Sequence, residues 1–529
     1  MILVSFDRRP RISDFVTSPE EMASDMSALD LKVVAPPQIY FDEERLFFDE
    51  QSQTFYYSVT EGSKSGLDPH VSLSSALPDA KLMFSSRITA ELIAGNTPIL
   101  LSVYNDTDYE IFFLKVTTLP MINIDCSETI TASVNSEIYL TVFDNGKNSE
   151  KRLTESKGVI HSRGATSALY PKANYRISLK QDSPGGSSRN NRVSLLGMRQ
   201  DDDWLLYAAY SDPEKIRNVF SQNLWHVSCN TDNSYRKETG TQYRFVELFL
   251  NRQYCGLYAI CPPIDEKMLG LNGDLTEQVL YKYVYFVGDH PEKTENNTAA
   301  GVLIKHPSPD DPPDSDGNYG KKEYRLFFRY FDYLNDHRDD NSLLAGGIDM
   351  DNAIDIHLFI NLIQGVDQTR AEDSTIKNLY LALFRENGRI KGLYCPWDMD
   401  LAWGNLWAGD IVHNMVGSYY LSPEDDFNID CGYLAQMIKN DRQSLTKALS
   451  DKYAELRAHA WSDENILAML NEYEAQIFDS GAYLREMSRW PDATFEDPNL
   501  KLSVFKEYVL RRLEVCDKTY GFNGGKQDE

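Results

Sequence analysis

The sequence lacks the patterns that mark several common protein classes. No run of roughly eighteen apolar residues occurs in the 529-residue chain, so a transmembrane helix is not expected. The P-loop motif G-x-x-x-x-G-K-[ST], the zinc-protease motif H-E-x-x-H and the hydrolase motif G-x-S-x-G are also missing. These absences argue against P-loop nucleotidases, metalloproteases and α/β-hydrolases.

Cysteine is sparse, and its seven copies are scattered without a C-x-x-C pair. This pattern argues against a disulfide scaffold or a zinc site, so we expect buried free thiols. Residues 1–25 carry charges such as Asp7, Arg8 and Arg9 and contain no apolar h-region of the length that a signal peptide has, so no secretory signal is expected. With no membrane segment in view, the default expectation is a cytoplasmic protein that does not bind a membrane.

Positively charged residues are outnumbered by negatively charged ones. The chain has 53 Lys and Arg residues against 80 Asp and Glu residues, a net charge of −27 and a pI near 4.8. Nucleic acid is therefore not an expected partner, because phosphate binding depends on clustered Lys and Arg. An acidic surface keeps a protein soluble, and it can also steer a basic, Ser/Thr-rich protein substrate towards a site.

The composition that remains, with 42% hydrophobic and 12% aromatic residues, is that of a globular protein, and the length allows two or three domains. The order of strand-rich and helical segments predicts an α+β fold. Residues 1–30 are predicted to be a polar extension. Residues 31–120 show short alternating runs between turn signals, which predicts a small β-sandwich module. Residues 121–290 are predicted to be strand-rich with one main helix, and residues 291–529 mainly helical. The polar, Pro- and Asp-rich stretch 288–325 is expected to be an exposed loop.

The most informative stretch is a predicted β-hairpin with polar residues at its open end. Lys377 and Asn378 precede an apolar strand, and Asp398 and Asp400 follow the second strand. A hairpin of this kind brings an amide oxygen and carboxylates together. Such oxygen ligands suit Mg²⁺ or Mn²⁺, with Ca²⁺ as a further candidate.

An aspartate upstream adds a second pattern. Asp373 and Asn378 have the Asp-x4-Asn spacing of a protein-kinase catalytic loop, in which the Asp orients the hydroxyl nucleophile and the Asn holds a metal. The hypothesis is a phosphoryl-transfer site. An isolated D-x-D such as Asp398-Met399-Asp400 is more often a strand end or a helix cap, and it also occurs in metal-dependent nucleotide-sugar transferases.

The chain resembles the CotH kinase family, the spore coat protein H group of atypical protein kinases. Four segments carry the resemblance in the expected order, and together they lie within roughly residues 120–520: Gly158–Ser167 with Pro171–Leu179, Asp203–Asn218, Val246–Tyr258, and Lys377–Gly404.

The resemblance implies an atypical two-lobed protein-kinase-like fold, with a strand-rich N-lobe and a helical C-lobe. It also implies ATP- and metal-dependent phosphoryl transfer to Ser or Thr of a protein, and a spore-associated location as an alternative to the cytoplasm. The residues that would carry the activity fall into three groups. They are Arg163, Gly164, Ser167, Lys172 and Arg217 for ATP; Asn378, Asp398 and Asp400 for metal; and Asp367, Asp373 and Lys377 for catalysis.

The sequence departs from the family pattern at three places. Ala173 stands where a second Lys is usual, and the hairpin turn is Asn251-Arg252 where Asn-Gly is common, which places Arg252 where a positive φ is expected. In the family, the Asp of a Gly-x-Asp motif normally stands five residues before the metal-binding Asn, which is Asn378 in this chain. Asp367 has that local sequence and Asp373 has that spacing, so the sequence leaves both open as the catalytic aspartate.

The main helix of the strand-rich part is predicted to start at Asp212-Pro213, with an Asp or Ser cap and Pro at the first position. In a kinase-like lobe, Glu214 or Arg217 of this helix would pair with the nucleotide-binding Lys, although a capping or surface role fits either residue. Two other functions stay open. One is an inactive kinase-like binding or assembly protein of a spore coat or cell surface, and the other is a nucleotide-sugar transferase.

Overall fold

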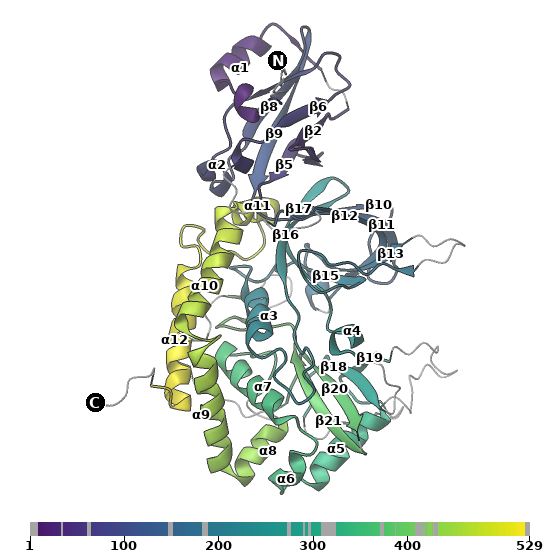
Figure 1. The fold of residues 1–529 in the computed structure, drawn as a ribbon, viewed down its shortest axis with the longest axis vertical. Coiled ribbons are helices and arrows are strands. Elements are labelled where there is room, and N and C mark those ends of the chain that lie inside the picture. The colour runs from purple at the N-terminus through teal and green to yellow at the C-terminus, as the bar shows by residue number, and fades with distance from the viewer. Residues whose placement is uncertain are drawn as a thin grey trace, which may run out of the picture. The chain divides into compact units, whose positions relative to one another are not determined.

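The computed structural model describes residues 9–32, 35–60, 65–146, 152–164, 166–181, 189–271, 277–288, 291–294, 298–307, 324–370, 375–386, 388–407, 416–417, 421–425, 427 and 432–523. The fold is mixed α+β, with 31% helix and 30% strand (Figure 1). The chain forms two compact units. The first, here called the barrel unit, consists of Met1–Ala208, Arg244–Ile260 and Glu472–Ala493. The second, the hairpin unit, consists of Ala209–Tyr243, Cys261–Asn471 and Thr494–Glu529.

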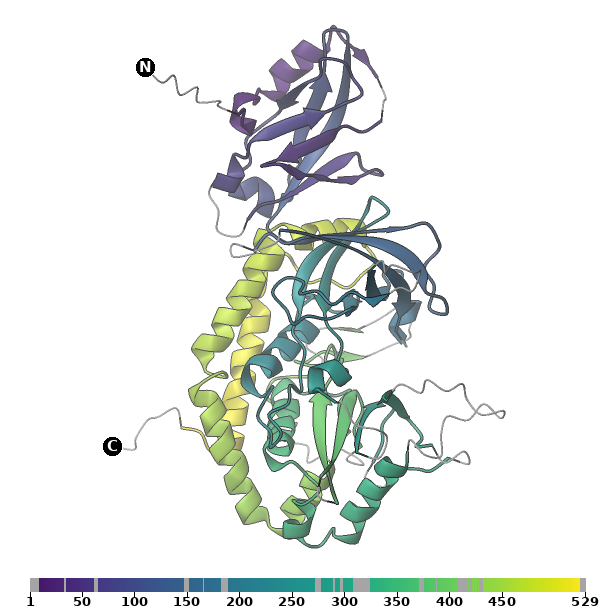
Figure 2. The ribbon, with the colours of Figure 1, turned by 45° about the vertical axis from the view of Figure 1, so that its right-hand side comes forward.

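The N-terminal part of the barrel unit, here called the N-terminal module, contains two sheets around one apolar core (Figure 2, purple). Phe41, Phe55, Leu101 and Leu114 are fully buried in this core. The larger sheet has the order β4-β5-β9-β8-β7 with β1 beside β9, and the smaller has the order β3-β2-β6. The elements are α1 (Pro19–Met26), β1 (Asp30–Leu31), β2 (Gln38–Phe41), β3 (Glu44–Arg45), β4 (Phe47–Asp49), β5 (Thr54–Ser58), β6 (Val71–Ser74), β7 (Lys81–Phe84), α2 (Ala90–Ala94), β8 (Ile99–Tyr104) and β9 (Asp108–Thr117).

The segment predicted to be a polar extension includes the helix α1. Ser18 caps this helix and forms a capping box with Glu21, which explains why the helix begins here. Met22 and Met26 are buried against Met83, so the helix α1 is part of the packed module.

The second part of the barrel unit is a seven-stranded barrel. The sheet order β12-β11-β10-β16-β17-β15-β13 closes on itself because β12 also pairs with β13, and β14 (Arg189–Asn190) extends one edge. Alternate residues point inward and form an apolar core that includes Ile124, Leu140, Ile177, Trp204 and Leu248. The strand bounds are β10 (Met121–Cys126), β11 (Ser136–Phe143), β12 (Leu153–Arg163), β13 (Asn174–Gln181), β15 (Asp203–Tyr207), β16 (Arg244–Leu250) and β17 (Gln253–Cys261). The α+β class is confirmed, but the predicted two-lobed kinase-like division is not.

The β16–β17 hairpin has the backbone that its sequence predicted. Asn251 and Arg252 both have positive φ values, 50° and 58°, as a two-residue turn between right-twisted strands requires. The Asn251 side chain also accepts a hydrogen bond of 2.7 Å from the Cys126 amide. Asn251 therefore joins the turn to the neighbouring strand β10.

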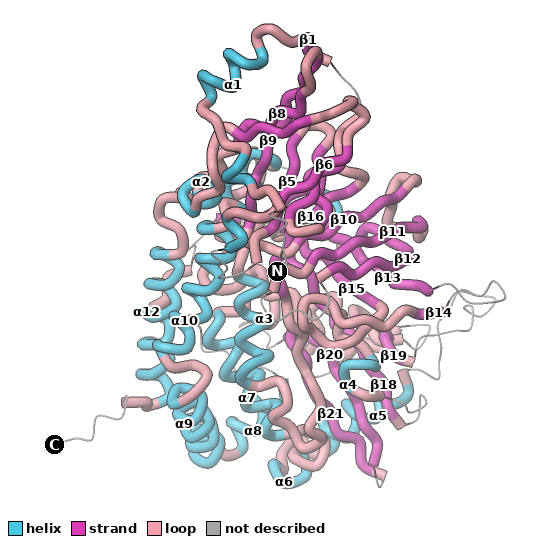
Figure 3. Tube along the Cα trace, turned by 45° about the horizontal axis from the view of Figure 1, so that its top comes forward, coloured by secondary structure: helices cyan, strands magenta, loops and turns pink. Residues whose placement is uncertain are grey.

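The hairpin unit contains a four-stranded sheet of order β19-β18-β20-β21 together with most of the helices. Its strands are β18 (Gln278–Tyr283), β19 (Val302–His306), β20 (Leu379–Glu386), β21 (Arg389–Pro396), β22 (Leu406–Trp407) and β23 (Val416–Gly417). Helices α7, α9 and α12 pack against one another (Figure 3, cyan). The helices are α3 (Arg217–Ser228), α4 (Glu266–Leu269), α5 (Arg325–Asp336), α6 (Asn341–Leu344), α7 (Met350–Ile363), α8 (Gly432–Asn440), α9 (Arg442–Ala458), α10 (Asp463–Glu474) and α12 (Ser503–Tyr520). The helix α11 (Ala482–Arg489) belongs to the barrel unit.

Three local expectations differ from the structure. The α3 helix starts at Arg217 and not at Pro213, because the Asp212 carboxylate accepts the Arg217 amide at 2.7 Å and the residues between form turns. The stretch 288–325 is not wholly a loop, since it contains β19 paired with β18. The expected boundary near residue 290 does not coincide with the two units, because α3 and β18 belong to the hairpin unit.

The expectations about the cysteines and about a transmembrane helix can also be compared with the structure. The described cysteines are free thiols, and all of them except Cys255 are buried. No helix in the described part of the chain is long and apolar enough to cross a membrane.

Candidate catalytic and metal-binding site

The open end of the β20–β21 hairpin holds Asn378 and Asp398. Leu379, the first residue of β20, pairs with Pro396, the last residue of β21, and the Trp397 amide donates to the Asn378 carbonyl at 3.0 Å. The Asn378 amide in turn donates to the carbonyl of Tyr283 at the end of β18, at 3.2 Å. Residues 378 and 398 therefore leave the sheet at neighbouring positions, as the sequence predicted.

Asp367 reaches the same place because the chain after it folds back on itself. The Lys377 amide donates to the Gln368 carbonyl at 3.1 Å, Thr369 pairs with Ile376, and the Arg370 amide donates to the Thr375 carbonyl at 3.1 Å. Because residues 368–370 pair with residues 375–377 in this short antiparallel ladder, Asp367 and Asn378 lie close together although ten residues separate them in the sequence. Asp373 lies outside the described residues.

The Asp367 carboxylate is held by two neighbours. Lys377 Nζ lies 2.7 Å from both carboxylate oxygens, and Asn378 Nδ2 lies 2.7 Å from one of them. The Asp367 side chain is only 21% exposed. Burial raises the pKa of Asp367, as does the charge of Asp398, while Lys377 and Asn378 oppose that rise.

Two residues at the hairpin end have an unusual backbone. Asn378 and Asp398 have φ values of 51° and 57°, in the left-handed region that most residues other than glycine avoid. Asn and Asp tolerate this region better than other residues, and such conformations gather at functional sites. Gln368 fixes the Asp398 conformation, since its Nε2 donates to the Trp397 carbonyl at 3.1 Å and to the Asp398 carbonyl at 2.9 Å.

Asp400 is buried and has several other carboxylates near it. Burial raises the pKa of Asp400 well above its ordinary value, and the carboxylates of Asp398, Asp367 and Asp212 raise it further. Its Oδ1 atom accepts the Leu401 amide at 3.1 Å. Such crowding is unfavourable without a cation, and it is expected where carboxylates serve as metal ligands.

These residues fit a hard divalent cation. Asn378, Asp398 and Asp400 offer amide and carboxylate oxygens, the donor set that Mg²⁺, Mn²⁺ and Ca²⁺ prefer. Among the described residues, Asp367, Asp398 and Asp400 do not bring three carboxylate oxygens within 4.8 Å of one another. Asn378 and water would therefore have to complete the coordination of an ion held here.

The α3 helix holds the loop that carries both aspartates. Gln222 Nε2 donates to the Pro396 carbonyl at 3.0 Å, the Asn218 side chain accepts the Met399 amide at 2.9 Å, and Trp403 Nε1 donates to Ser221 at 2.9 Å. The three helix residues have i, i+3, i+4 spacing and so share one face. Sequence reasoning missed Ser221 and Gln222. The signal was present, since both polar residues stand in the sequence between the apolar pairs Val219-Phe220 and Leu224-Trp225.

Arg217, predicted to contact ATP, is fully buried in the hairpin unit. Its guanidinium pairs with Asp212 at 2.7 Å and with Glu214, and lies 5.1 Å from the centre of the Phe505 ring. Glu214 therefore pairs with Arg217. The expectation that Glu214 or Arg217 pairs with the nucleotide-binding Lys is wrong, because Lys172 has another partner.

The predicted phosphate loop follows β12 in the barrel unit. Gly164 has a φ of 135°, and a Cβ atom there would lie 2.4 Å from Ser167 Oγ, so glycine is required at this position. Asn174 holds the loop from the next strand, because its Nδ2 donates to Ser167 Oγ at 3.1 Å. Arg163, the last residue of β12, is half-buried, and Ala165 lies outside the described residues.

Lys172 is fully buried, and its ammonium group has three protein acceptors. Nζ donates to the Ala208 carbonyl at 2.7 Å, the Leu257 carbonyl at 2.5 Å and the Glu486 carboxylate at 2.5 Å. An ammonium group has three N–H bonds, so all are used within the protein. In this structure Lys172 joins the residue after β15 to the strand β17 and the helix α11. Its predicted contact with phosphate stays a prediction.

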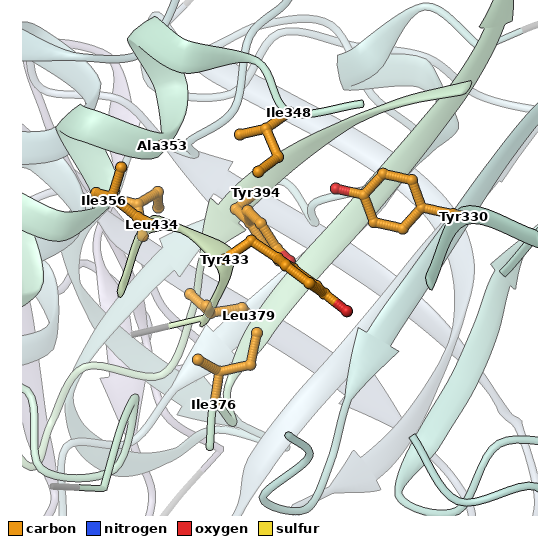
Figure 4. A pocket seen from close by; sticks show the side chains of 9 residues that line it. All are labelled: Tyr330, Ile348, Ala353, Ile356, Ile376, Leu379, Tyr394, Tyr433 and Leu434. Atoms are coloured by element: carbon orange, nitrogen blue, oxygen red, sulfur yellow. The ribbon is translucent and has the colours of Figure 1, made fainter. Parts of the chain in front are cut away.

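A small cavity lies next to the loop that carries Lys377 and Asn378 but is not the candidate site itself (Figure 4). Ile376 and Leu379, which flank Lys377 and Asn378, contribute to its wall with Tyr330, Tyr394 and Tyr433. Its volume of about 40 Å³ and its apolar lining do not suit a nucleotide. The cavity backs the loop that carries Asn378.

The structure thus brings Asp367, Lys377, Asn378, Asp398 and Asp400 together in the hairpin unit, and Arg217 belongs to the same unit. The predicted ATP-binding residues Arg163, Gly164, Ser167 and Lys172 belong to the barrel unit.

A comparison with curated proteins gives no match. A family model described as CotH kinase protein matches residues 160–516, the main part of the chain, and this range includes every candidate residue named above. That description indicates a kinase-like function. The chain belongs to the CotH kinase family.

Proposed function

We propose that this protein is a Ser/Thr protein kinase that uses ATP and Mg²⁺ or Mn²⁺. The observation that carries the proposal is the Asp367 carboxylate, which contacts Lys377 and Asn378 at the end of the hairpin that leads to Asp398 and Asp400. Phosphoryl transfer needs little covalent chemistry from a protein, so positioning and charge neutralisation carry the rate. The chain supplies groups for both.

Asp367 is proposed as the residue that receives the hydrogen bond of the acceptor hydroxyl. A general base works best when its pKa lies near the operating pH, and burial moves the pKa of Asp367 in that direction. Lys377 and Asn378 orient the carboxylate through their 2.7 Å contacts. Lys377, whose side chain is 24% exposed, can also neutralise charge on the transferred group.

Asn378, Asp398 and Asp400 are proposed to hold the metal. When bound, a divalent ion would neutralise the charge of the nucleotide phosphates. The chain itself fixes the ligands, because Gln368 and Asn218 hold the backbone on either side of Asp398. Ca²⁺ is a further candidate on the same donor set.

The ATP phosphates are proposed to meet Arg163 and the backbone N–H groups from Gly164 to Ser167. Loops in which glycine allows close backbone approach are suited to phosphate. Lys172 anchors the chain that follows this loop, through its three buried hydrogen bonds. Arg217 is proposed to balance the buried charge of Asp212 and Glu214 close to Asp400.

The proposed substrate is a basic, Ser/Thr-rich protein, in keeping with the net charge of −27. A direct test is to incubate the protein with γ-labelled ATP and Mg²⁺ or Mn²⁺, with EDTA as the metal-free control. We expect label on protein Ser or Thr. Asp367→Asn should abolish transfer and retain ATP binding, since it keeps the shape and removes the base.

The matched control is Asp351→Asn, which alters an exposed carboxylate at the start of α7. Its activity should equal that of the wild type. Binding of ATP without transfer by the wild type would instead support a binding or assembly protein of a spore coat or cell surface. Transfer from a nucleotide sugar would support the transferase alternative.

A further inference from the structure

The N-terminal module lies outside the residues 160–516 that match the family, yet it is joined to the barrel by buried polar contacts. Their centre is Glu247 on β16, which is 0% exposed. Thr117, the last residue of β9 in the module, donates to Glu247 Oε1 at 3.0 Å. Tyr254 donates to the other oxygen of Glu247, and the Tyr254 ring stacks on Tyr56 of the module at 5.2 Å.

The α11 helix provides the cation for Glu247. Arg485 is 1% exposed, and its Nε donates to Glu247 Oε1 at 3.0 Å while its Nη2 donates to the Ser480 carbonyl at 2.8 Å. Its Nη1 lies 3.5 Å from the side-chain oxygen of Asn96, which follows α2 of the module. Arg485 therefore joins the module and the barrel through the same guanidinium.

The start of α11 lies in close contact with the module. Gly481 precedes the helix with a φ of 74°, and a Cβ atom there would lie 2.3 Å from the Ile93 carbonyl oxygen. No larger residue fits without displacing the α2 backbone. The backbone at the start of α11 therefore packs directly against the backbone of α2 in the module.

The residue after Arg485 holds the predicted nucleotide-binding lysine. Glu486 is 0% exposed; its Oε1 accepts from Lys172 at 2.5 Å, and its Oε2 accepts the Leu257 amide at 2.8 Å. A Cβ atom at Gly256 would lie 2.2 Å from Glu486 Oε2, so the carboxylate needs a glycine beneath it. Any shift of Glu486 would leave a buried charge without its partner, which is strongly unfavourable.

We propose that Arg485 and Glu486 are positioning residues through which the N-terminal module sets the place of Lys172 and of the loop from Arg163 to Ser167. Neighbouring residues of one helical turn cannot move independently, so a contact made by Arg485 is transmitted to Glu486. Lys172 and Asn174 fix the chain directly after the loop. The module then controls ATP affinity, an inference that rests on the proposed function.

A purely structural network makes a different prediction. If these contacts only stabilise the fold, weakening one of them lowers the melting temperature and leaves ATP affinity unchanged at temperatures where the protein is folded. If they position the loop, the same change raises the Kd for ATP, and it raises the KM for ATP without changing the KM for the acceptor protein. The two roles are therefore separable by measurement.

The test uses the full chain with Thr117→Val, an isosteric change that leaves Arg485 in place. It removes the hydrogen bond from Thr117 to Glu247 and, with it, the 3.2 Å hydrogen bond that the Thr117 hydroxyl accepts from the Leu119 amide. Thr118→Val, one residue further on, is the matched control, because the Thr118 side chain is outside this network. Arg485→Lys and Arg485→Met complete the set, as Lys keeps the charge and Met does not. The readouts are the Kd of a non-hydrolysable ATP analogue and amide hydrogen exchange over residues 163–174.

We expect Thr117→Val to raise the Kd by about three- to tenfold and to speed exchange in residues 163–164 and 166–174. Thr118→Val should change neither, and Arg485→Lys should recover part of the affinity that Arg485→Met loses. Faster exchange with an unchanged Kd would overturn the proposal in favour of a structural network. Unchanged exchange would overturn it as well. Neither readout needs turnover, so an inactive wild type would count against the proposed kinase activity alone.

Discussion

At the residue scale, the site concentrates negative charge at the end of one hairpin. Asp367 is balanced by Lys377 and Asn378, whereas burial and three neighbouring carboxylates raise the pKa of Asp400. Charges of one sign held close together cost stability unless they have a use. The proposed use is metal binding, which links the unfavourable electrostatics of the free protein to its function.

This link predicts opposite effects of Asp400→Asn on stability and on metal binding. Without metal, the variant should be more stable by about 1 kcal/mol, because a crowded carboxylate becomes neutral and its oxygen can still accept the Leu401 amide. With metal, it should lose affinity, because a ligand charge is removed. Thermal unfolding with EDTA and with Mg²⁺ or Mn²⁺ measures both. A lower melting temperature in EDTA would contradict the crowding argument.

A second residue-scale prediction concerns His357 in α7, which is 1% exposed. Burial lowers the pKa of His357 from 6.5 to about 4. The folded state then binds a proton more weakly than the unfolded state, so stability is intact above pH 6.5 and is lost as the pH falls towards 4. The loss is at most about 3 kcal/mol.

Replacing His357 by Leu should remove that part of the pH dependence between pH 6.5 and 4. Urea unfolding at several pH values provides the measurement. His459→Leu alters an exposed histidine and serves as the control, whose pH profile should follow the wild type. An unchanged slope in the His357 variant would show that other groups cause the acid sensitivity.

At the element scale, hairpins could be predicted from the sequence and long-range pairings could not. The β20–β21 hairpin follows from an apolar run and the turn after it, and the positive φ of Asn251 and Arg252 follows from the chemistry of a two-residue turn. The place of Asp367 beside Asn378 has no local signal, because it depends on Thr369 pairing with Ile376. Asp373, the other candidate, lies outside the described residues.

Other features of the site have no local signal either. Glu486 lies 314 residues from its partner Lys172, so no spacing rule connects the two. The helix α3 starts later than predicted, because the Asp212 carboxylate accepts the Arg217 amide across the intervening turns, whereas a capping side chain normally acts within three residues. In both cases a tertiary contact outweighs the sequence pattern.

The α3 helix yields an element-scale prediction, because it holds the loop through Asn218. Asn218→Ala leaves the Met399 amide, between Asp398 and Asp400, without its 2.9 Å acceptor. We expect a stability loss of about 1–2 kcal/mol and a larger effect on activity, roughly a tenfold or greater fall in kcat. Denaturant unfolding and steady-state kinetics on the same samples measure the two effects.

Asn223→Ala is the matched control for this prediction. Asn223 lies on the same helix, and its side chain exchanges hydrogen bonds of 3.1 and 2.8 Å with the backbone of Tyr243, away from the aspartates. Its loss should cost similar stability and leave kcat close to that of the wild type. Equal falls in kcat for both variants would mean that α3 acts only through overall stability.

At the scale of the whole molecule, the acidic charge could be read from the composition and the α+β class from the order of strand-rich and helical segments. The barrel could be read from neither. Barrel closure requires β12 to pair with both β11 and β13. The barrel unit also takes in Glu472–Ala493, a segment that sequence order assigns to the helical part. Discontinuous units of this kind arise from packing, which local periodicity does not encode.

The net charge of −27 gives the whole-molecule prediction. If the field of the protein steers a basic acceptor, kcat/KM for a Ser peptide rich in Lys and Arg should fall steeply as NaCl rises from about 0.05 M to about 0.5 M. Salt shortens the Debye length from above 10 Å to only a few ångströms over this range, so steering is lost while contacts within the site persist.

A neutral Ser peptide of equal length is the control, and its kcat/KM should change little. Asp367→Asn is a second control: phosphate transfer that persists in this variant would come from a contaminating kinase and not from this site. A preference for an acidic peptide, or the same salt response for both peptides, would show that the acidic surface serves solubility and plays no part in choosing the substrate.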